Sequence, residues 1–385
     1  MPRTLWPERF KKFYQQLTET TGARSIFLSN STKRRHLLLS YTLLFFLFQL
    51  LLVGFLLHEK NTDQESYLQQ ILAQEEISQE ATIAFYRMQA RLLCNSYINR
   101  PEILTLLHDA AGAGPEEKNR LRRQLYEEFF PTYALIQKNL FPQVHFIFAD
   151  GTSFLRMHQP TQFGDNLSTI RPSIKKISHE KQYMEGFEVG RHTDAFRFIF
   201  PLSHNGAYLG SMEFSLPPSL FQETIAQQYK TDYRFILKKT VADGALLASV
   251  MKTRPPSPLS EDFYQEQEEE SSLVDLHKHR TPSEVITAIN RKLRGNVMKN
   301  LQQEISFIRT INLAGSNFII TFLPIRDLEQ QLAGYRISYQ KDTHLALALP
   351  HLVQLYLGGT FLMLLILAGG PHHPSHAEWS RRKGR

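Results

Sequence analysis

The stretch VHFIFADGTSFLRMH, residues 144–158, is where the chain changes from helical to strand periodicity. Runs rich in β-branched and aromatic residues lie on both sides of Asp150-Gly151, a dipeptide typical of tight turns. This pattern predicts two antiparallel strands joined by a short turn. Because alternate side chains of a strand point to opposite faces, Phe154, Arg156 and His158 are expected to share one face.

The residues after this stretch predict the rest of one module. NLSTIRPSIKKISHEK, residues 166–181, places three isoleucines at helical spacing. Three further strands are predicted at residues 185–189, 195–202 and 208–216, with a turn at Asn205-Gly206 between the last two. Two strands, a helix and three strands in that order indicate an α+β fold, an antiparallel sheet with helices on one side.

The region before residue 141 reads as helical. A long amphipathic helix is predicted from Asn61 to Asn95, and its apolar stripe is expected to face the core. The stripe consists of Ile77, Ala81, Ala84, Met88 and Leu92.

The positive charge of the chain lies at its two ends. Residues 1–35 carry a balance of +6 and residues 371–385 a balance of +3, so the remainder of the net charge of +7 is −2 between them. This distribution argues against a nucleic-acid partner, because the central region has no basic excess. The single Cys94 cannot form an internal disulfide.

Two uncharged apolar runs frame the central region. Residues 37–57 number 21, enough to cross the hydrocarbon core as a helix, and residues 345–367 form a second, less apolar run. A cleaved signal peptide is the alternative for the first run, but its apolar region would be shorter. Since Lys and Arg flank both runs on the side away from the centre, both termini are expected in the cytoplasm and residues 58–344 outside.

The central region also shows a weak internal repeat. FADG ending at Gly151 resembles VADG ending at Gly244, and FIFPLSHNGAYLGSMEF resembles ITFLPIRDLEQQLAGYRISY. The second copy is longer by a polar stretch rich in Pro, Ser and Glu, residues 252–282, which is expected to be an inserted loop.

With DGTSFLRMHQPTQFGDNLSTIRPSI, GFEVGR and FPLSHNGAYLGSMEF, the chain resembles double Cache domains, the PAS-like extracytoplasmic sensors of bacterial receptors. The subtype is the double sensory domain of two-component sensor kinases. The resemblance implies a long N-terminal helix, two tandem modules with antiparallel sheets and two flanking transmembrane helices. The expected segments are a cytoplasmic N-terminus (1–36), a first span (37–57), a helical stalk (58–140), a membrane-distal module (141–220), a membrane-proximal module (221–344) with its inserted loop (252–282), a second span (345–367) and a cytoplasmic tail (368–385).

A ligand site is expected in the distal module. An arginine fork suits a carboxylate or phosphate, and the amides of a helix N-terminus at Arg171-Pro172 would add to the attraction for an anion. The alternative is an internal clamp, in which Arg156 or Arg171 pairs with Asp165 or Glu188 without any ligand. The candidate residues are Arg156, His158, Asp165, Arg171, Phe154, Phe187, Glu188, Arg191 and Arg197.

No catalytic motif, cofactor site or metal site is predicted, and a hydrolase that uses His158 and Asp165 is a minor alternative. The function expected is therefore an inner-membrane sensor, the input part of a signalling receptor, that binds a small anionic molecule and forms a homodimer. Relatives of this kind carry a kinase or cyclase output, which we expect to be missing or truncated here. The other class considered is a membrane protein that captures a solute or a partner protein without signalling.

Overall fold

The structure, a computed structural model, describes residues 31–138, 140–229, 231–252, 254–266 and 281–368. The chain divides into two compact units, one of residues 1–67 with 344–385 and one of residues 68–343. Most of the predicted N-terminal segment and tail lie outside the described residues.

The larger unit combines helices with two sheets. Its helices are α3 (Ser31–Leu93, from Leu68 onward), the short π-helix η1 (Cys94–Ile98), α4 (Pro101–Gly112), α5 (Pro115–Ile136), α6 (Pro172–Glu180), α7 (Pro218–Tyr229), α8 (Lys239–Ala245), α9 (Ala248–Met251) and α10 (Ser283–Gln303). Its strands are β1 (Gln143–Phe148), β2 (Ser153–Arg156), β3 (Met184–Val189), β4 (Asp194–His204), β5 (Ala207–Leu216), β6 (Asp232–Lys238), β7 (Phe263–Gln265), β8 (Phe307–Leu313), β9 (Ser316–Arg326) and β10 (Leu332–Asp342).

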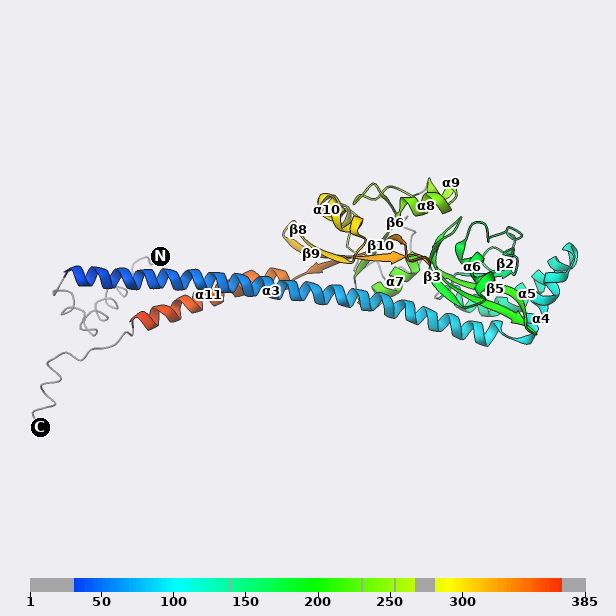
Figure 1. The fold of residues 1–385 in the computed structure, drawn as a ribbon, viewed down its shortest axis with the longest axis horizontal. Coiled ribbons are helices and arrows are strands. Elements are labelled where there is room, and N and C mark those ends of the chain that lie inside the picture. Colours follow the sequence, from blue (N-terminus) through cyan, green and yellow to red (C-terminus); the bar gives the residue numbers. More distant parts are fainter. Residues whose placement is uncertain (1–30, 139, 230, 253, 267–280, 369–385) are drawn as a thin grey trace, which may run out of the picture. The chain divides into compact units, whose positions relative to one another are not determined.

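The two sheets have the same topology. The first has the order β2-β1-β5-β4-β3 and the second β7-β6-β10-β9-β8, and all their strand pairs are antiparallel. We call the first sheet with α4 to α6 the first module, and the second sheet with α7 to α10 the second module (Figure 1). The predicted α+β fold with a long N-terminal helix and two antiparallel sheets is confirmed.

Two glycines anchor the repeat in the strands. Gly210 pairs with Phe148 and Gly334 with Leu237. A Cβ at Gly210 would lie 2.1 Å from the carbonyl oxygen of Ile147, and one at Gly334 would lie 2.2 Å from that of Ile236, so only glycine fits. The β4–β5 and β9–β10 hairpins are therefore the repeated unit, whereas VADG lies in α8 and has no turn like that of FADG.

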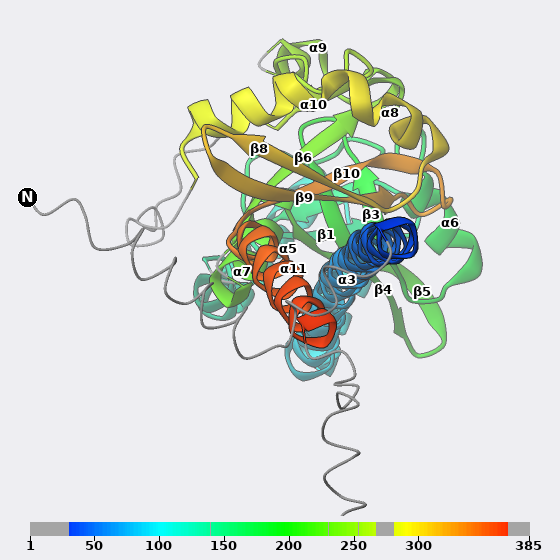
Figure 2. The same cartoon turned by 90° about the vertical axis from the view of Figure 1, so that its left-hand side faces the viewer.

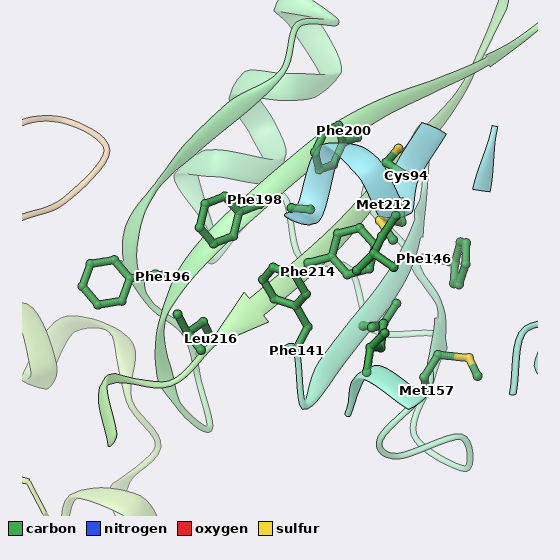
Figure 3. Packing of buried hydrophobic residues seen from close by; sticks show 14 of the residues in the cluster. Cys94, Phe141, Phe146, Met157, Phe196, Phe198, Phe200, Met212, Phe214 and Leu216 are labelled. Carbon is green, nitrogen blue, oxygen red and sulfur yellow. The ribbon is translucent and has the colours of Figure 1, made fainter. Parts of the chain in front are cut away.

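The first sheet is covered on both faces. One face packs against α3, α4 and α5 in an aromatic core that includes Phe141, Phe198 and Phe214 (Figure 3). On the other face Ile174 and Ile177 of α6 pack against Ile147 and Ile199 of the sheet. The expectation of helices on one side is therefore wrong. The apolar side of α6 must be buried, and the sheet face opposite the aromatic core provides the surface against which it packs.

The apolar stripe predicted for α3 does not face the core. Ile77, Met88 and Leu92 are 67%, 60% and 56% exposed, while Tyr86 and Ala90 are buried. One residue along a helix turns the side chain by about 100°, so the buried face lies beside the predicted one. The helical period was predicted correctly and the buried face was not.

The second module differs from the expectation in its insertion. Residues 252–282, expected as a loop, contain β7, which pairs with β6 and buries Phe263. Residues 267–280 of that stretch lie outside the described residues. The long helix α10 covers one face of the second sheet (Figure 2), with Ile289, Leu293 and Val297 in the core.

The smaller unit contains the start of α3 and α11 (His344–Ala368). The two helices touch, because Thr360 donates a hydrogen bond of 3.1 Å to the Gln49 amide oxygen and the rings of Tyr67 and His344 are 4.4 Å apart. Among the described residues one helix, Leu39–Ile98, is long and apolar enough to cross a membrane, and the apolar stretch Pro350–Leu365 of α11 is shorter.

Candidate functional site

A cavity of about 600 Å³ lies on the α6 face of the first sheet. The sheet contributes His145, Arg197 and Glu213 to its wall. The segment between β2 and α6 and the turn between β3 and β4 enclose it from the sides. Pockets of this size accept small molecules, and a few fixed polar groups orient them.

Two buried arginines and two buried glutamates form a network beneath the cavity. Arg171 donates to Glu188 at 2.8 Å and also to Glu213, and Arg197 donates to Glu213 at 2.6 Å. Ser173, in the first turn of α6, donates its amide to Glu188 at 3.0 Å. The four ionic side chains are each at most 7% exposed, so the network neutralises itself out of contact with bulk water.

The network keeps Glu213 and Arg171 ionised. Burial alone would raise the pKa of Glu213, but Arg171 and Arg197 hold it well below its ordinary value. Burial alone would lower the pKa of Arg171, but Glu188 and Glu213 raise it. Opposite charges at hydrogen-bond distance outweigh desolvation for these two residues, whereas burial lowers the pKa of Arg197.

A second ion pair closes the segment between β2 and α6 over the sheet. Arg156 donates to both oxygens of Asp165 at 2.8 Å each, and to the carbonyl oxygen of Gln162 at 2.9 Å. The hydrogen bond from Arg156 lowers the pKa of Asp165. This bidentate geometry fixes the segment that forms one side of the cavity.

Two histidines face the same cavity as neutral rings. Burial lowers the pKa of His145 well below its ordinary value, and its Nε2 lies 2.8 Å from the Ser153 hydroxyl. Burial and Arg156 lower the pKa of His158 to about 4. Nδ1 of His158 is buried and has no hydrogen-bond partner among the described residues. A buried polar atom without a partner is costly unless something else binds it.

One cation of the cavity is left over. Arg191, in the turn between β3 and β4, is exposed, lines the cavity, and has no ion-pair partner among the described residues. The other cations of the wall are matched, since Arg156 pairs with Asp165, and the network beneath the cavity holds two cations and two anions. The cavity therefore carries one positive charge in excess, which favours an anion.

The structure brings most of the predicted residues together. Arg156, His158, Asp165, Arg171, Arg191 and Arg197 line the cavity, and Glu188 lies behind Arg171 and Arg197. Both interpretations of these charges therefore describe the geometry: the predicted pairs Arg156–Asp165 and Arg171–Glu188 exist, and they border an open cavity.

Two aromatic candidates lie elsewhere. Phe154 was expected beside Arg156, but a bulge between β1 and β2 interrupts the alternation, and Phe154 packs in the core against Phe148 at 4.5 Å. Phe187 alternates with Glu188 on β3 and therefore faces away from the network, against Phe196 and Phe235.

Two important residues were missed. His145 lies on β1 opposite Arg156 and Glu213, and Glu213 lies on β5. The alternating pattern of β1 and β5 could have placed both on the polar face of the sheet, had the strand order been known.

The comparisons with known proteins agree with this picture at the level of the family. Residues 118–289 match the family model described as the double sensory domain of two-component sensor kinase. Over these residues the chain is similar to this family of sensory domains. The matched part includes every residue that lines the cavity, and the resemblance to double Cache sensors is confirmed over it.

Solved structures similar to the sensory domain have low identity. The sensory domain of the Campylobacter jejuni chemoreceptor Tlp3 with isoleucine bound is 10% identical, with a TM-score of 0.37, and the similarity covers 74% of this chain and 97% of that one. The ligand-binding domain of Tlp3 in complex with L-valine is 9% identical, with a TM-score of 0.36 and coverage of 74% and 97%. The sensor domain of the V. cholerae histidine kinase DctB is 12% identical, with a TM-score of 0.37 and coverage of 71% and 98%. No curated protein matches the chain.

Proposed function

We propose that the chain is the input part of a membrane receptor and that its first module binds a small anionic molecule in the cavity described above. The observation that carries this proposal is that one cavity contains both the side chain of Arg191 and the buried Nδ1 of His158, neither of which has a partner in the part of the chain that the structure describes. Arg191 would attract the anionic group of the ligand, and His158 would hydrogen bond to a second polar group on it. The match to a sensory domain supports a signalling role.

The ligand is best sought with the full chain in detergent micelles. A panel of carboxylates, phosphates and amines is added, and the unfolding temperature is followed. We expect at least one small carboxylate or phosphate to raise the unfolding temperature. In Arg191→Gln, the apparent affinity for this anion, taken from the dependence of the shift on its concentration, should be at least tenfold weaker. Arg123→Gln, at an exposed position of α5 outside the cavity, is the matched control. A response to amines only, or an equal response in both variants, would show that Arg191 does not contact the ligand.

The membrane arrangement is part of the same proposal. Residues 37–57 and 345–367 would span the membrane, residues 58–344 would lie outside the cytoplasm, and the modules would occupy residues 141–220 and 221–344. The apolar start of α3 and the basic residues at both chain ends support this topology. Reporter fusions at position 200 and at each end test it: a cytoplasmic signal at position 200 would exclude the arrangement.

A homodimer is the expected assembly, since α3 leaves Ile77, Met88 and Leu92 exposed along one side. A second copy of the same helix would cover this apolar surface. Met88→Cys should form a disulfide-linked dimer on oxidation of membranes that contain the full chain. Glu329→Cys, at an exposed position of the second module, is the control, and equal crosslinking at both positions would argue against an α3 interface.

A further inference from the structure

Leu247 belongs to the second module but lines the cavity of the first. It stands between α8 and α9, in the chain that leaves β6. Leu246 and Leu247 both have extended backbones, so their side chains point in opposite directions. Leu246 is buried in the core, and Leu247 turns toward the cavity with 38% of its surface exposed.

Leu247 is held against the turn between β3 and β4. Its amide donates to the carbonyl oxygen of Arg191 at 2.9 Å, and within the turn Gly190 donates to Thr193 at 2.9 Å. Close packing restricts this turn, because a Cβ at Gly190 would lie 2.8 Å from a guanidinium nitrogen of Arg197. At this turn Leu247 therefore meets Arg191, which is unpaired among the residues that the structure describes, and Arg197 of the buried network.

A buried ion pair fastens the same two segments a second time. Arg254, which follows α9, pairs with Asp194 at the start of β4, and their side chains are only 11% and 2% exposed. Breaking one side of such a pair is costly, because the remaining charge loses its partner in a dry environment. The turn between β3 and β4 is thus bound at Arg191 by Leu247 and just after the turn, at Asp194, by Arg254.

Other contacts between the modules have a different character. The rings of Phe187 and Phe235 lie 5.3 Å apart in the shared core, and Phe187 forms a backbone bridge with Asp327 of the second module. These contacts are buried and continuous with the sheets. The short helix α9 has no fully buried residue, and such elements are the first to move when a neighbouring site is filled.

We propose that Leu247 is the wall that limits the size of the ligand, and that the Asp194–Arg254 pair makes the segment Leu247–Arg254 the route by which a filled cavity displaces the second module. The proposal rests on the cavity being the ligand site. A ligand that reaches past Arg191 pushes on Leu247, and the ion pair carries this displacement to α9 and β6. Ligand binding changes an equilibrium only when one conformation binds more tightly, and the movable wall supplies that difference.

Thiol chemistry tests the proposal without a known ligand. Leu247→Cys is reacted in the full chain with an anionic methanethiosulfonate that carries an ethylsulfonate and with its trimethylammonium counterpart. We expect the ratio of anionic to cationic rate to be at least threefold higher at position 247 than at Leu135→Cys, an exposed site outside the cavity. The native Cys94, 1% exposed, provides the unreactive background.

The attached ethylsulfonate then serves as a tethered anion in the cavity. Hydrogen exchange of peptides from β6, β7 and α9 should change at least twofold after modification at position 247 and should not change after modification at position 135. With Arg254→Gln present, the rates of both reagents at position 247 should rise and the effect on β6 and β7 should disappear.

Equal rate ratios at the two positions would show that Leu247 is not part of a cationic cavity. Unchanged exchange in β6 and β7, or an effect that persists with Arg254→Gln, would show that the segment is not the route. Neither result depends on whether the panel of soluble anions contains the ligand, so failure of this inference and failure of the proposed function are distinguishable.

Discussion

The two modules share a strand order, but the same face of the sheet is charged in the first module and apolar in the second. With Gly210 matched to Gly334, Glu213 corresponds to Ile337, and Arg197 on the neighbouring strand corresponds to Ile320. Glu188 of β3 likewise corresponds to Ile311 of β8. Three buried charges of the first module are thus isoleucines in the second, all buried beneath α10.

The residue before the helix that covers this face also changes from charged to uncharged. Arg171-Pro172-Ser173 begins α6, and Thr281-Pro282-Ser283 leads into α10. The charged partner of the network is therefore a threonine in the second module. Since the second module folds around isoleucines at these positions, the fold itself does not require charge there, which supports the proposed ligand site in the first module.

On the opposite face of the two sheets, an apolar residue of the first module corresponds to a charged residue of the second. Met212, fully buried in the first core, corresponds to Arg336, which lies 3.0 Å from Glu75 of α3. Burial raises the pKa of Glu75 despite this contact. The helix α3 therefore meets the second module through a buried ion pair, which requires one specific register, whereas it meets the first through the buried Tyr86 and Ala90 and the less buried pair Arg87–Glu185.

Removing Arg171 alone should have the largest effect on stability. Arg171→Met leaves Glu188 and Glu213 short of a cation in a buried site, and we expect the free energy of unfolding to fall by about 3–5 kcal/mol. Thr281→Val, at the corresponding position of the second module, should change it by less than about 1 kcal/mol. Denaturant unfolding of the full chain measures both, and equal losses would contradict the difference between the modules.

The buried histidines of the cavity predict a pH dependence of the free energy of unfolding. The pKa of His158 is lowered to about 4, so the unfolded chain binds more protons than the folded chain between that value and the ordinary value of 6.5. The free energy of unfolding should therefore fall as the pH drops through this window, by about 3 kcal/mol in total from His158. Stability curves of the chain and of His158→Gln, recorded between pH 7 and pH 4.5, check the sign: the variant should lose less stability, and identical slopes would refute it.

Converting the first module to the residues of the second should change anion binding far more than stability. Arg171→Thr, Glu188→Ile, Arg197→Ile and Glu213→Ile together replace a complete buried network by apolar side chains. Such replacements are often neutral, so we expect the free energy of unfolding to change by no more than about 2 kcal/mol. The stabilisation by anions should disappear. A folded variant that still responds to the anion would mean that the network has no part in the site.

The smallest effect is expected at the segment over the cavity. Asp165, with a side chain 41% exposed, pairs with Arg156 near the surface, so Asp165→Asn should cost no more than about 1 kcal/mol. Because the substitution also releases a second cation, the anion should bind more tightly to this variant. Titration calorimetry with the strongest anion of the panel measures the change, and a weaker affinity would show that the segment must be fixed for binding.

Much of the fold follows from local patterns. The strands around Asp150-Gly151, the helix after Arg171 and the hairpins of the repeat were predicted from the alternation of side chains, and the structure contains them. The ion pairs of Arg156 and Arg171 were anticipated because buried charges need partners. These features depend on residues close together in the chain or on general electrostatic requirements.

What the sequence by itself determined is the order and type of the elements, the apolar segments near both ends and most of the charged residues of the cavity. Only the tertiary structure decided which side of α3 is buried, that a bulge turns Phe154 into the core, and that Leu247 of one module closes the cavity of the other. The reason is physical: periodicity tells which side chains share a face, but the neighbour that covers the face comes from distant parts of the chain.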